Sequence, residues 1–283
     1  MTADGRMWRC GRYALVLDRP LVMGIVNITP DSFSDGGTFL DPVAALRHGH
    51  ALAAAGADLV DVGGESTRPG SDEVSAGEEL ARVLPVVEAL ALGLDIPVSV
   101  DTRHPAVARA CVEVGASVVN DVSGFRDAGM IEVAAACDAG LVVMHMLGEP
   151  KTMQAEPRYD AVVAEVGAYL AAHAAMLEGA GVAADRICVD PGIGFGKTTE
   201  HNLEIIRRLP ELAELGYPVL VGASRKRFIG EITGESEPTR RLGGSVAAAL
   251  AAIARGASVV RVHDVAETLQ ALRVWQAIGG ETW

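Results

Sequence analysis

The sequence is poor in aromatic residues and carries no excess of basic charge, and each shortage excludes a class of protein. Phe, Trp and Tyr together make up only 4% of the chain, which leaves few rings to stack against sugars. The formal net charge is −13, whereas nucleic-acid binding requires a broad basic surface. We therefore expect no nucleic-acid partner.

Cysteines and long apolar runs are also scarce. The four cysteines are widely scattered and form no C-x-x-C pair, which favours free thiols in a reducing cytosol: Cys10, Cys111, Cys137 and Cys188. The longest apolar stretch, residues 246–254, is about half of what a membrane span needs. The N-terminus has no apolar core of a signal peptide. We therefore expect a cytoplasmic protein without a membrane segment.

What the chain does contain is a set of eight short apolar runs with helical periodicity between them. Nearly every run ends on a polar residue, at Asn27, Glu65, Asp101, Asp121, His145, Asp190, Lys226 and His263. This alternation predicts an α/β fold, a single-domain (β/α)₈ TIM barrel, whose active site lies at the C-terminal ends of the strands. An open doubly wound sheet is the alternative. Eight evenly spread strand ends and a length of 283 residues favour the closed barrel.

Local signals divide the chain further. Residues 8–17 predict a β-hairpin that turns at Gly11, so residues 1–19 form an N-terminal segment that plugs the barrel and residues 20–283 form the barrel. Helix starts are marked by capping residues and prolines, namely Asp41 with Pro42, Ser75 with Glu78, Pro105, and Asp264 with Glu267.

Three polar strand ends suggest the kind of ligand. Asp101, Asn120 and Asp190 end the third, fourth and sixth strands. Carboxylate and amide groups together suit a flat heterocycle with several N–H donors, such as a 2-amino-4-oxopyrimidine edge. Two carboxylates could instead serve a glycosidase, but the cationic residues nearby and the few aromatics weigh against sugars.

The first two loops predict a metal and a phosphate contact. Asn27 ends the first strand and offers a neutral oxygen, which can hold Mg²⁺ beside a diphosphate because substrate phosphates and water supply the other ligands. The loop after the second strand carries Thr67 and Arg68, and the arginine follows a strand end on the active face, where it is expected to contact a phosphate. Glu65 is expected to orient that loop.

A basic cluster on the last two strands predicts an anion site. It comprises Ser224-Arg225-Lys226-Arg227 and, on the next strand, Arg261 and His263, which share one face because they are two residues apart. Strands seven and eight of barrels frequently build such a site. By contrast, residues 192–198 are no phosphate loop, since Pro191 stands where that motif requires glycine. We interpret them as a flexible turn whose Phe195 covers a ligand, and His145 as a supporting residue.

Several of these segments together resemble a known family. MGIVNITPDSFSDGG, DVGGESTRPG, SVDT, VNDVSG, DPGIGFGKTTEHN, GASRKRFIG and RVHD are similar, in order, to the motifs of the dihydropteroate synthase family. The match covers almost the whole chain. One departure is Leu147-Gly148, where the family commonly has Gln-Gly.

The resemblance implies an activity and a set of roles. The activity is Mg²⁺-dependent condensation of 6-hydroxymethyl-7,8-dihydropterin diphosphate with p-aminobenzoate. Asn27 would bind Mg²⁺, and Arg68, Arg261 and His263 would hold the diphosphate. The pterin ring would be held by Asp101, Asn120, Asp190 and Lys226, of which Lys226, Asp101 and Asp190 carry the catalysis. The p-aminobenzoate site would be framed by Phe33, Thr67, Phe195, Ser224 and Lys226.

The family also implies partners. Sulfonamides would inhibit as mimics of p-aminobenzoate, and two copies of the chain would form a homodimer through the late helices. Two rival functions use a similar barrel, a corrinoid-linked methyltransferase and a non-catalytic pterin-binding homologue. The first would lack the cationic cluster at Lys226, Arg261 and His263, and the second would be expected to lose residues of the first two loops, which look intact.

Overall fold

The computed structural model describes residues 6–28, 42–65, 73–149 and 151–280. Within these ranges the strands are short and the helices follow them in alternation. The strands are β1 Met7–Cys10, β2 Tyr13–Val16, β3 Leu21–Asn27, β4 Leu59–Gly63, β5 Val98–Asp101, β6 Val118–Asp121, β7 Gly140–Met144, β8 Ile187–Asp190, β9 Leu220–Val221 and β10 Val259–Val262. The helices are α1 Pro42–Ala54, α2 Ala76–Gly93, α3 Pro105–Glu113, α4 Ala128–Ala136, α5 Val162–Gly179, α6 Thr199–Arg207, α7 Leu209–Ala213, α8 Arg227–Thr233, α9 Leu242–Ile253 and α10 Val265–Ala277.

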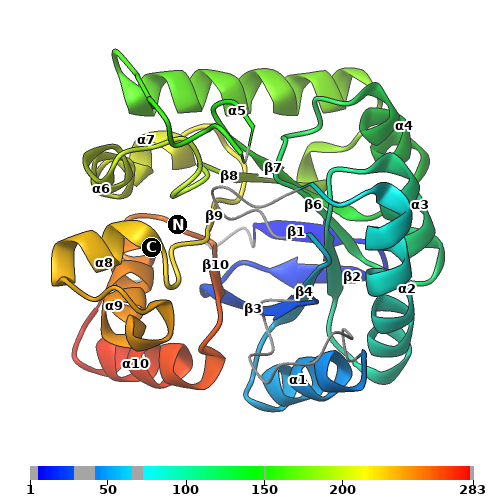
Figure 1. Ribbon diagram of the computed structural model, residues 1–283, viewed down its shortest axis with the longest axis horizontal. Coiled ribbons are helices and arrows are strands. Elements are labelled where there is room, and N and C mark those ends of the chain that lie inside the picture. Colours follow the sequence, from blue (N-terminus) through cyan, green and yellow to red (C-terminus); the bar gives the residue numbers. More distant parts are fainter. Residues whose placement is uncertain (1–5, 29–41, 66–72, 150, 281–283) are drawn as a thin grey trace.

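The main sheet has eight parallel strands in the order β8-β7-β6-β5-β4-β3-β10-β9. Its two edges meet, because Val189 of β8 forms a parallel bridge with Val219 and its N–H donates to the carbonyl of Pro218 at 2.9 Å. The helices form a ring outside the strands (Figure 1). The predicted (β/α)₈ barrel is therefore confirmed, and the open-sheet alternative is excluded.

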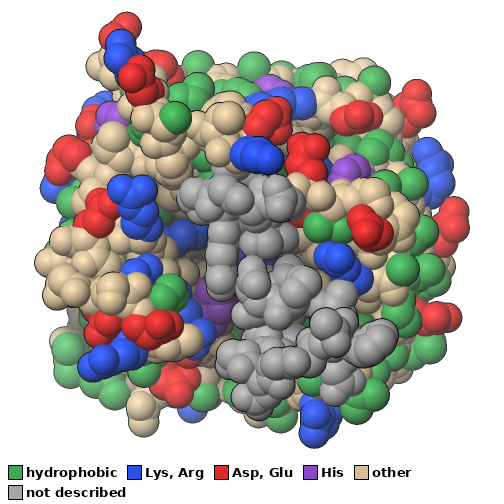
Figure 2. Space-filling view, viewed as in Figure 1, with side chains coloured by type: hydrophobic (Ala, Val, Ile, Leu, Met, Phe, Trp, Pro, Cys, Tyr) green, Lys and Arg blue, Asp and Glu red, His purple; other side chains and the backbone are tan. Residues whose placement is uncertain are grey.

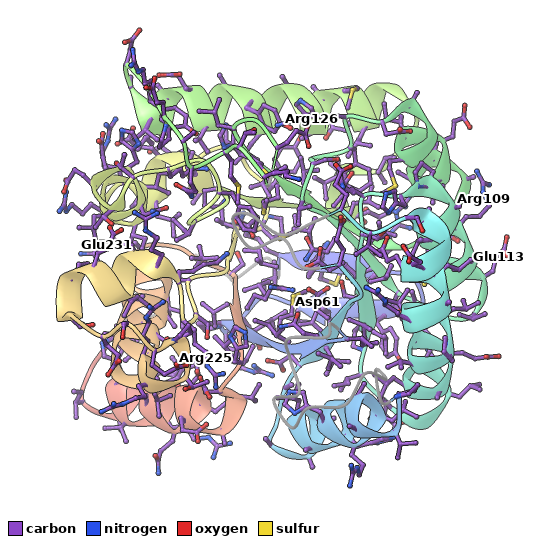
Figure 3. The ribbon with its side chains drawn as sticks, in the orientation of Figure 1. Asp61, Arg109, Glu113, Arg126, Arg225 and Glu231 are labelled. Carbon is purple, nitrogen blue, oxygen red and sulfur yellow. The ribbon has the colours of Figure 1, made fainter. Side chains whose placement is uncertain are left out.

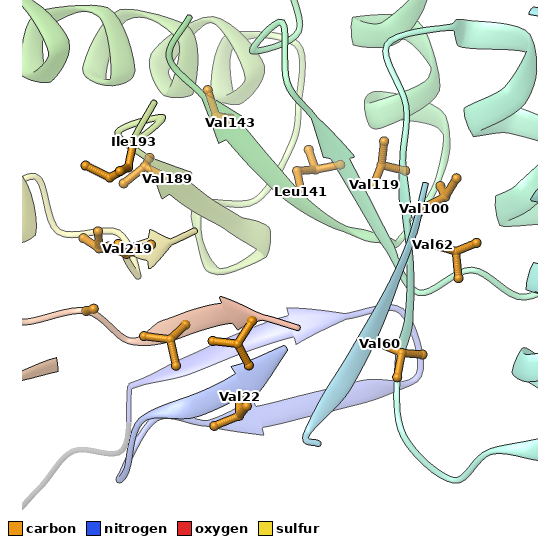
Figure 4. Close-up of a cluster of buried hydrophobic side chains, with 14 of the residues drawn as sticks. Val22, Val60, Val62, Val100, Val119, Leu141, Val143, Val189, Ile193 and Val219 are labelled. Atoms are coloured by element: carbon orange, nitrogen blue, oxygen red, sulfur yellow. The ribbon is translucent and has the colours of Figure 1, made fainter. Parts of the chain in front are cut away.

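Side chains on the outward face of the strands pack against the helices. This layer is almost entirely valine, leucine and isoleucine, and Figure 4 shows part of it: Val22, Val60, Val62, Val100, Val119, Leu141, Val143, Val189, Ile193 and Val219. Each of these side chains is buried. Removal of this apolar surface from water is the main force that holds the helices on the barrel.

The opposite face of the strands fills the bottom of the barrel, and the hairpin β1-β2 packs against it. Met23, Leu59 and Val142 belong to one buried cluster with Trp8 and Cys10 of the hairpin. Trp8 is fully buried and its indole N–H donates to the carbonyl oxygen of Arg186 at 2.9 Å. The predicted hairpin is confirmed, and it lies against the N-terminal end of the strands.

The helix starts follow the sequence signals with one exception. Ser75 and Glu78 form a capping box at α2, and Pro105 is the first residue of α3. Asp41 lies outside the described residues. The prediction for Asp264 is wrong: it precedes α10 but its side chain makes no capping hydrogen bond. No helix within the described ranges is long and apolar enough to cross a membrane.

Candidate functional site

The carboxyl ends of the parallel strands bring the polar residues of the sequence together. Register pairs place Asn27 beside Gly63, Gly63 beside Asp101, and Asp101 beside Asn120 on consecutive strands. Arg261 lies on β10, which pairs with β3. Figure 2 shows basic and histidine side chains gathered toward the middle of this face. Phe33, Thr67 and Arg68 were also predicted to belong here, but they lie outside the described residues.

Arg261 and two acids form an ion-pair network in the mouth of the barrel. Its Nε donates to Asp61 Oδ2 at 2.6 Å and its Nη2 donates to Asp101 Oδ2 at 2.8 Å. Asn120 donates from Nδ2 to the same oxygen of Asp61 at 3.1 Å. Asp61 is fully buried and lies near the centre of the ring of helices (Figure 3). The guanidinium is therefore held rigidly, with a buried acid beneath it.

Burial changes the acidity of the two carboxyl groups that were predicted to carry catalysis. It raises the pKa of Asp101, and the neighbouring Arg261 opposes that rise. It also raises the pKa of Asp190 to about 6. There the opposing influences are a hydrogen bond of 2.7 Å from the N–H of Gly192 to Oδ1, and the positive charge of Lys226. Both acids thus lie in a poorly hydrated site where their charge has a large effect on a ligand.

Lys226 directs its ammonium across the ring of Phe195. Its Nζ lies 4.0 Å from the centroid of that ring, within the range of a cation–π contact. Gly194 allows this approach, because a Cβ at that position would lie 3.1 Å from Cδ of Lys226. Lysine and phenylalanine together offer an aromatic ring with a positive charge over one face, which suits an aromatic ligand with an acidic group.

The other arginines of the basic cluster point away from this pair. Arg225 donates to both carboxylate oxygens of Asp264, at 3.1 and 2.5 Å. Arg227 pairs with Glu231 on the exposed surface of α8. The pair with Arg225 explains why Asp264 caps no helix. Lys226 is the basic residue of this run that meets Phe195.

Ser224 and His263 connect the ends of β9 and β10. The serine Oγ lies 2.9 Å from Nδ1 of the histidine, and the N–H of His263 donates to the same oxygen at 3.3 Å. Ser224 is buried. The serine therefore fixes the orientation of the imidazole ring, as expected for a residue that presents one ring nitrogen to a ligand.

Two residues that sequence reasoning did not assign hold the loops around the site. Arg103, after β5, donates to Glu65 at 3.1 and 3.0 Å and to Glu73 at 3.1 Å, so it joins the two described residues that flank positions 66–72. Lys197 is buried and its Nζ lies 2.9 Å from Nδ1 of His145. The position just after a strand end could have identified Arg103, and the glycine-rich segment could have drawn attention to Lys197.

The side-chain oxygen of Asn27 is of the kind that binds a hard cation. Asn27 Oδ1 and Asp101 Oδ2 lie on either side of Gly63, because a Cβ at that glycine would be 3.9 Å from the first and 3.8 Å from the second. Magnesium prefers oxygen ligands and retains several waters. Within the described ranges no three His, Cys, Asp or Glu side chains gather to hold a metal by themselves. The donor set therefore fits a cation that a phosphate ligand helps to bind.

Comparisons with known proteins agree with this geometry. Residues 23–263 match the model of a family described as pterin binding enzyme. The chain is 51% identical over 277 residues to the dihydropteroate synthase of Neisseria meningitidis serogroup C, covering 96% of this chain and 98% of the relative. It also resembles the solved structure of Xanthomonas albilineans dihydropteroate synthase with 4-aminobenzoic acid, with a TM-score of 0.93, 50% identity, and coverage of 98% and 100%. For the Burkholderia cenocepacia dihydropteroate synthase complexed with 7,8-dihydropteroate, the TM-score is 0.87 at 48% identity, covering 97% and 96%.

Proposed function

The chain belongs to the pterin binding enzyme family and, within it, to the dihydropteroate synthases, and we propose how its residues divide the work of that reaction. The reaction joins 6-hydroxymethyl-7,8-dihydropterin diphosphate to p-aminobenzoate and yields 7,8-dihydropteroate and diphosphate. The chain is thus a transferase. The observation that carries the proposal is the arrangement of Asp101, Asn120 and Asp190 near the carboxyl ends of β5, β6 and β8, with the Lys226–Phe195 pair beside Asp190.

Asp101, Asn120, Asp190 and Lys226 bind the pterin ring. Carboxylate oxygens accept the N–H groups of its 2-amino-4-oxo edge, and an amide can accept one bond and donate another. Burial of Asp190 supports this role, because a hydrogen bond in a site without bulk water is stronger and discriminates better.

The diphosphate lies between Arg261, His263 and Arg68, with Mg²⁺ held by Asn27. When bound, Mg²⁺ neutralises charge on the leaving group. Arg261 adds a fixed positive charge whose orientation Asp61 maintains at 2.6 Å. His263 presents the ring nitrogen that Ser224 does not contact.

The residues Phe195, Ser224, Lys226, Thr67 and Phe33 bind p-aminobenzoate. The Phe195 ring supplies an apolar face, and the ammonium of Lys226 lies 4.0 Å from its centre. A planar aryl acid suits such a pair, since its ring packs on phenylalanine and its carboxylate is attracted by nearby positive charge. Sulfonamides, which share that shape, should compete for the same place.

The chemistry requires neither a strong base nor a covalent nucleophile. The C–O bond to diphosphate breaks, and its electrons leave with the diphosphate. The methylene group that remains is a cation conjugated to the pterin, and the charges of Asp101 and Asp190 stabilise it. The amine nitrogen of p-aminobenzoate then forms the new C–N bond and releases a proton to water. Positioning and charge therefore account for the catalysis.

A single assay tests the whole assignment. The protein is supplied with the pterin diphosphate, p-aminobenzoate and Mg²⁺, and released diphosphate and dihydropteroate are measured. Equal amounts of both products are expected. Pterin binding without diphosphate release would indicate a non-catalytic homologue. Methyl transfer to a corrinoid in place of this reaction would indicate a methyltransferase.

Replacement of Asn27 by alanine should weaken the dependence on Mg²⁺. Loss of one oxygen ligand is expected to raise the Mg²⁺ concentration for half-maximal activity by about 10-fold. Turnover at saturating Mg²⁺ should fall much less. An unchanged Mg²⁺ titration would contradict the assignment of Asn27 to the metal. Asn202→Ala is not a suitable control, because Asn202 accepts a hydrogen bond from the N–H of Gly194 in the loop near the site. The exposed Glu113 at the end of α3 offers the control Glu113→Ala.

We also propose a homodimer that packs through α9 and α10. The proposal is supported by an apolar cavity on these helices, lined by Leu250, Gln270, Ala271, Val274, Trp275 and Ile278. Val274 and Ile278 are 58% and 78% exposed, which is unusual for clustered large apolar side chains. We further propose the cytoplasm as the compartment, in keeping with the four free cysteines.

A charge on this surface should separate the two copies. Val274→Glu is expected to shift the protein from dimer to monomer, because a carboxylate cannot be buried in an apolar interface without a partner. Sedimentation velocity measures the change. The matched control is Leu92→Glu on α2, where the leucine is 83% exposed. A dimer that survives Val274→Glu would place the interface elsewhere.

A further inference from the structure

We propose that Lys197 is a positioning residue whose buried ammonium holds the loop of residues 192–198 in shape, so that Phe195 stays in place against Lys226 to receive the aryl amine. The inference rests on the proposed function only in assigning p-aminobenzoate to Phe195. The contacts of Lys197 with its own loop stand independently of that assignment.

The ammonium of Lys197 lies inside its own loop. Its Nζ donates to the carbonyl oxygens of Gly192 and Phe195, each at 3.0 Å, and it lies 2.9 Å from Nδ1 of His145. The residue is 3% exposed. A buried charge of this kind is costly unless it is fully hydrogen-bonded, and here the partners are main-chain groups that shape the loop.

Glycines make this inward arrangement of carbonyl groups possible. Gly192, Gly194 and Gly196 have positive φ angles of 68°, 82° and 62°, which residues with a Cβ rarely adopt. A Cβ on Gly192 would lie 1.9 Å from the carbonyl oxygen of His145. A phosphate-binding loop turns its N–H groups toward an anion. This loop instead turns carbonyl groups toward a cation that the chain itself supplies.

The outer side of the loop is held by other elements. Gln154 donates to the carbonyl of Gly194 at 2.7 Å, and Tyr159 donates from its hydroxyl to that of Gly196 at 2.9 Å. Lys197 provides the inner attachment, at the carbonyl of Phe195 itself. The ring of Phe195 is thereby fixed between a small cluster that includes Met146 and the ammonium of Lys226.

Burial works against the positive charge of Lys197, and a neighbouring acid supports it. Burial lowers the pKa of Lys197 to about 7, while Asp190 opposes that fall and Lys226 adds to it. Burial, and then the charge of Lys197, lower the pKa of His145 to about 3. The imidazole therefore stays neutral at physiological pH, and its Nδ1 can accept a hydrogen bond from the ammonium.

The test exploits the fact that the chain contains only three lysines, Lys151, Lys197 and Lys226. Lys197→Met keeps the length of the side chain and removes its donors. We expect the KM for p-aminobenzoate to rise about 10- to 100-fold, the effect of losing charged hydrogen bonds. The KM for the pterin diphosphate should change less, because Asp101 and Asn120 lie on other strands and the β-ladder also holds Asp190. The exposed Lys151 supplies the matched control Lys151→Met, with unchanged constants.

A double variant separates positioning from general damage. If Lys197 acts through Phe195, adding Lys197→Met to Phe195→Ala should raise the KM for p-aminobenzoate no further than Phe195→Ala alone. Additive effects, or equal rises in the two KM values, would overturn the proposal.

A measurement on the unaltered protein covers the case in which Lys197→Met does not fold. With lysine labelled by ¹³C at Cε, one of the three signals should titrate with a midpoint near pH 7, because burial lowers the pKa of Lys197 to about 7. Three signals that all titrate above pH 10 would overturn the proposal. If the unaltered protein made no dihydropteroate, the proposed function would fail, and this titration would still decide whether Lys197 is held as described.

Discussion

An Asp190→Asn variant is expected to fold normally and to turn over about 100 to 1,000 times more slowly, because the change removes one preorganised charge from the site. Asp190 ends β8 and is 5% exposed. The N–H of Gly192 donates to its Oδ1 at 2.7 Å, and the amide oxygen of asparagine can accept the same bond. The substitution therefore changes charge and leaves shape almost unaltered. Steady-state turnover and circular dichroism measure the two outcomes.

The same residue predicts a dependence on pH. Burial raises the pKa of Asp190 to about 6. Because the pKa is raised, the carboxylate is present above about pH 6 and is lost as the pH falls through that value. Turnover of the unaltered enzyme should fall with it, and the asparagine variant should lack this step. The exposed Asp185, which pairs with Arg9, offers the control Asp185→Asn, which should behave as the unaltered enzyme does.

Near-normal turnover of Asp190→Asn would contradict a role of this charge in catalysis. The pterin ring would then be held by shape and by the remaining donors alone. A large rise in the KM of the pterin diphosphate with little change in turnover would show that Asp190 binds substrate but does not accelerate the reaction. In that case Asp190 would bind the ground state and the transition state equally.

The strand ends of the site were predictable from sequence for a physical reason. Parallel strands are buried on both faces and appear as apolar runs, so the first polar residue after each run marks the C-terminal edge. Asn27, Asp101 and Asp190 all follow that rule. Their meeting at one face needed no information beyond the closure of the barrel.

Side-chain direction within a run was not predictable in the same way. In Ser224-Arg225-Lys226-Arg227, Arg225 has a left-handed φ of 59° and pairs with Asp264, 39 residues later. That partner lies on another element, so no local pattern identified it. The prediction that Asp264 caps α10 failed for the same reason. Its carboxylate forms an ion pair with Arg225 and makes no capping hydrogen bond.

The partners of buried charges escaped sequence reasoning as well. Asp61 lies within a strand run, and its partner Arg261 is 200 residues away. Lys197 sits in a glycine-rich segment whose pattern suggests phosphate binding, yet its own carbonyl groups surround it. The partner of a buried charge is decided by which atoms approach within about 3 Å in the folded chain. The spacing of residues in the sequence does not contain that information.

Replacement of Arg261 by methionine should damage both stability and activity. Asp61 is fully buried and would lose its partner at 2.6 Å. Breaking a buried ion pair in this way is expected to lower the free energy of unfolding by about 3–5 kcal/mol. Activity should also be lost, because Arg261 holds Asp101 at 2.8 Å and contributes positive charge to the diphosphate site. Urea denaturation followed by circular dichroism measures the first effect, and diphosphate release measures the second.

The two effects separate in a double variant. In Asp61→Asn with Arg261→Met, the buried charge and its partner are removed together, and the asparagine oxygen still accepts the bond that Asn120 donates at 3.1 Å. Asp101 still loses its partner Arg261 in this variant, so stability should recover only in part, while activity should not recover. Arg208→Met, which breaks only exposed ion pairs on α6 and α7, should change neither. Recovery of activity in the double variant would show that Arg261 serves the fold alone, and that the diphosphate is held without it.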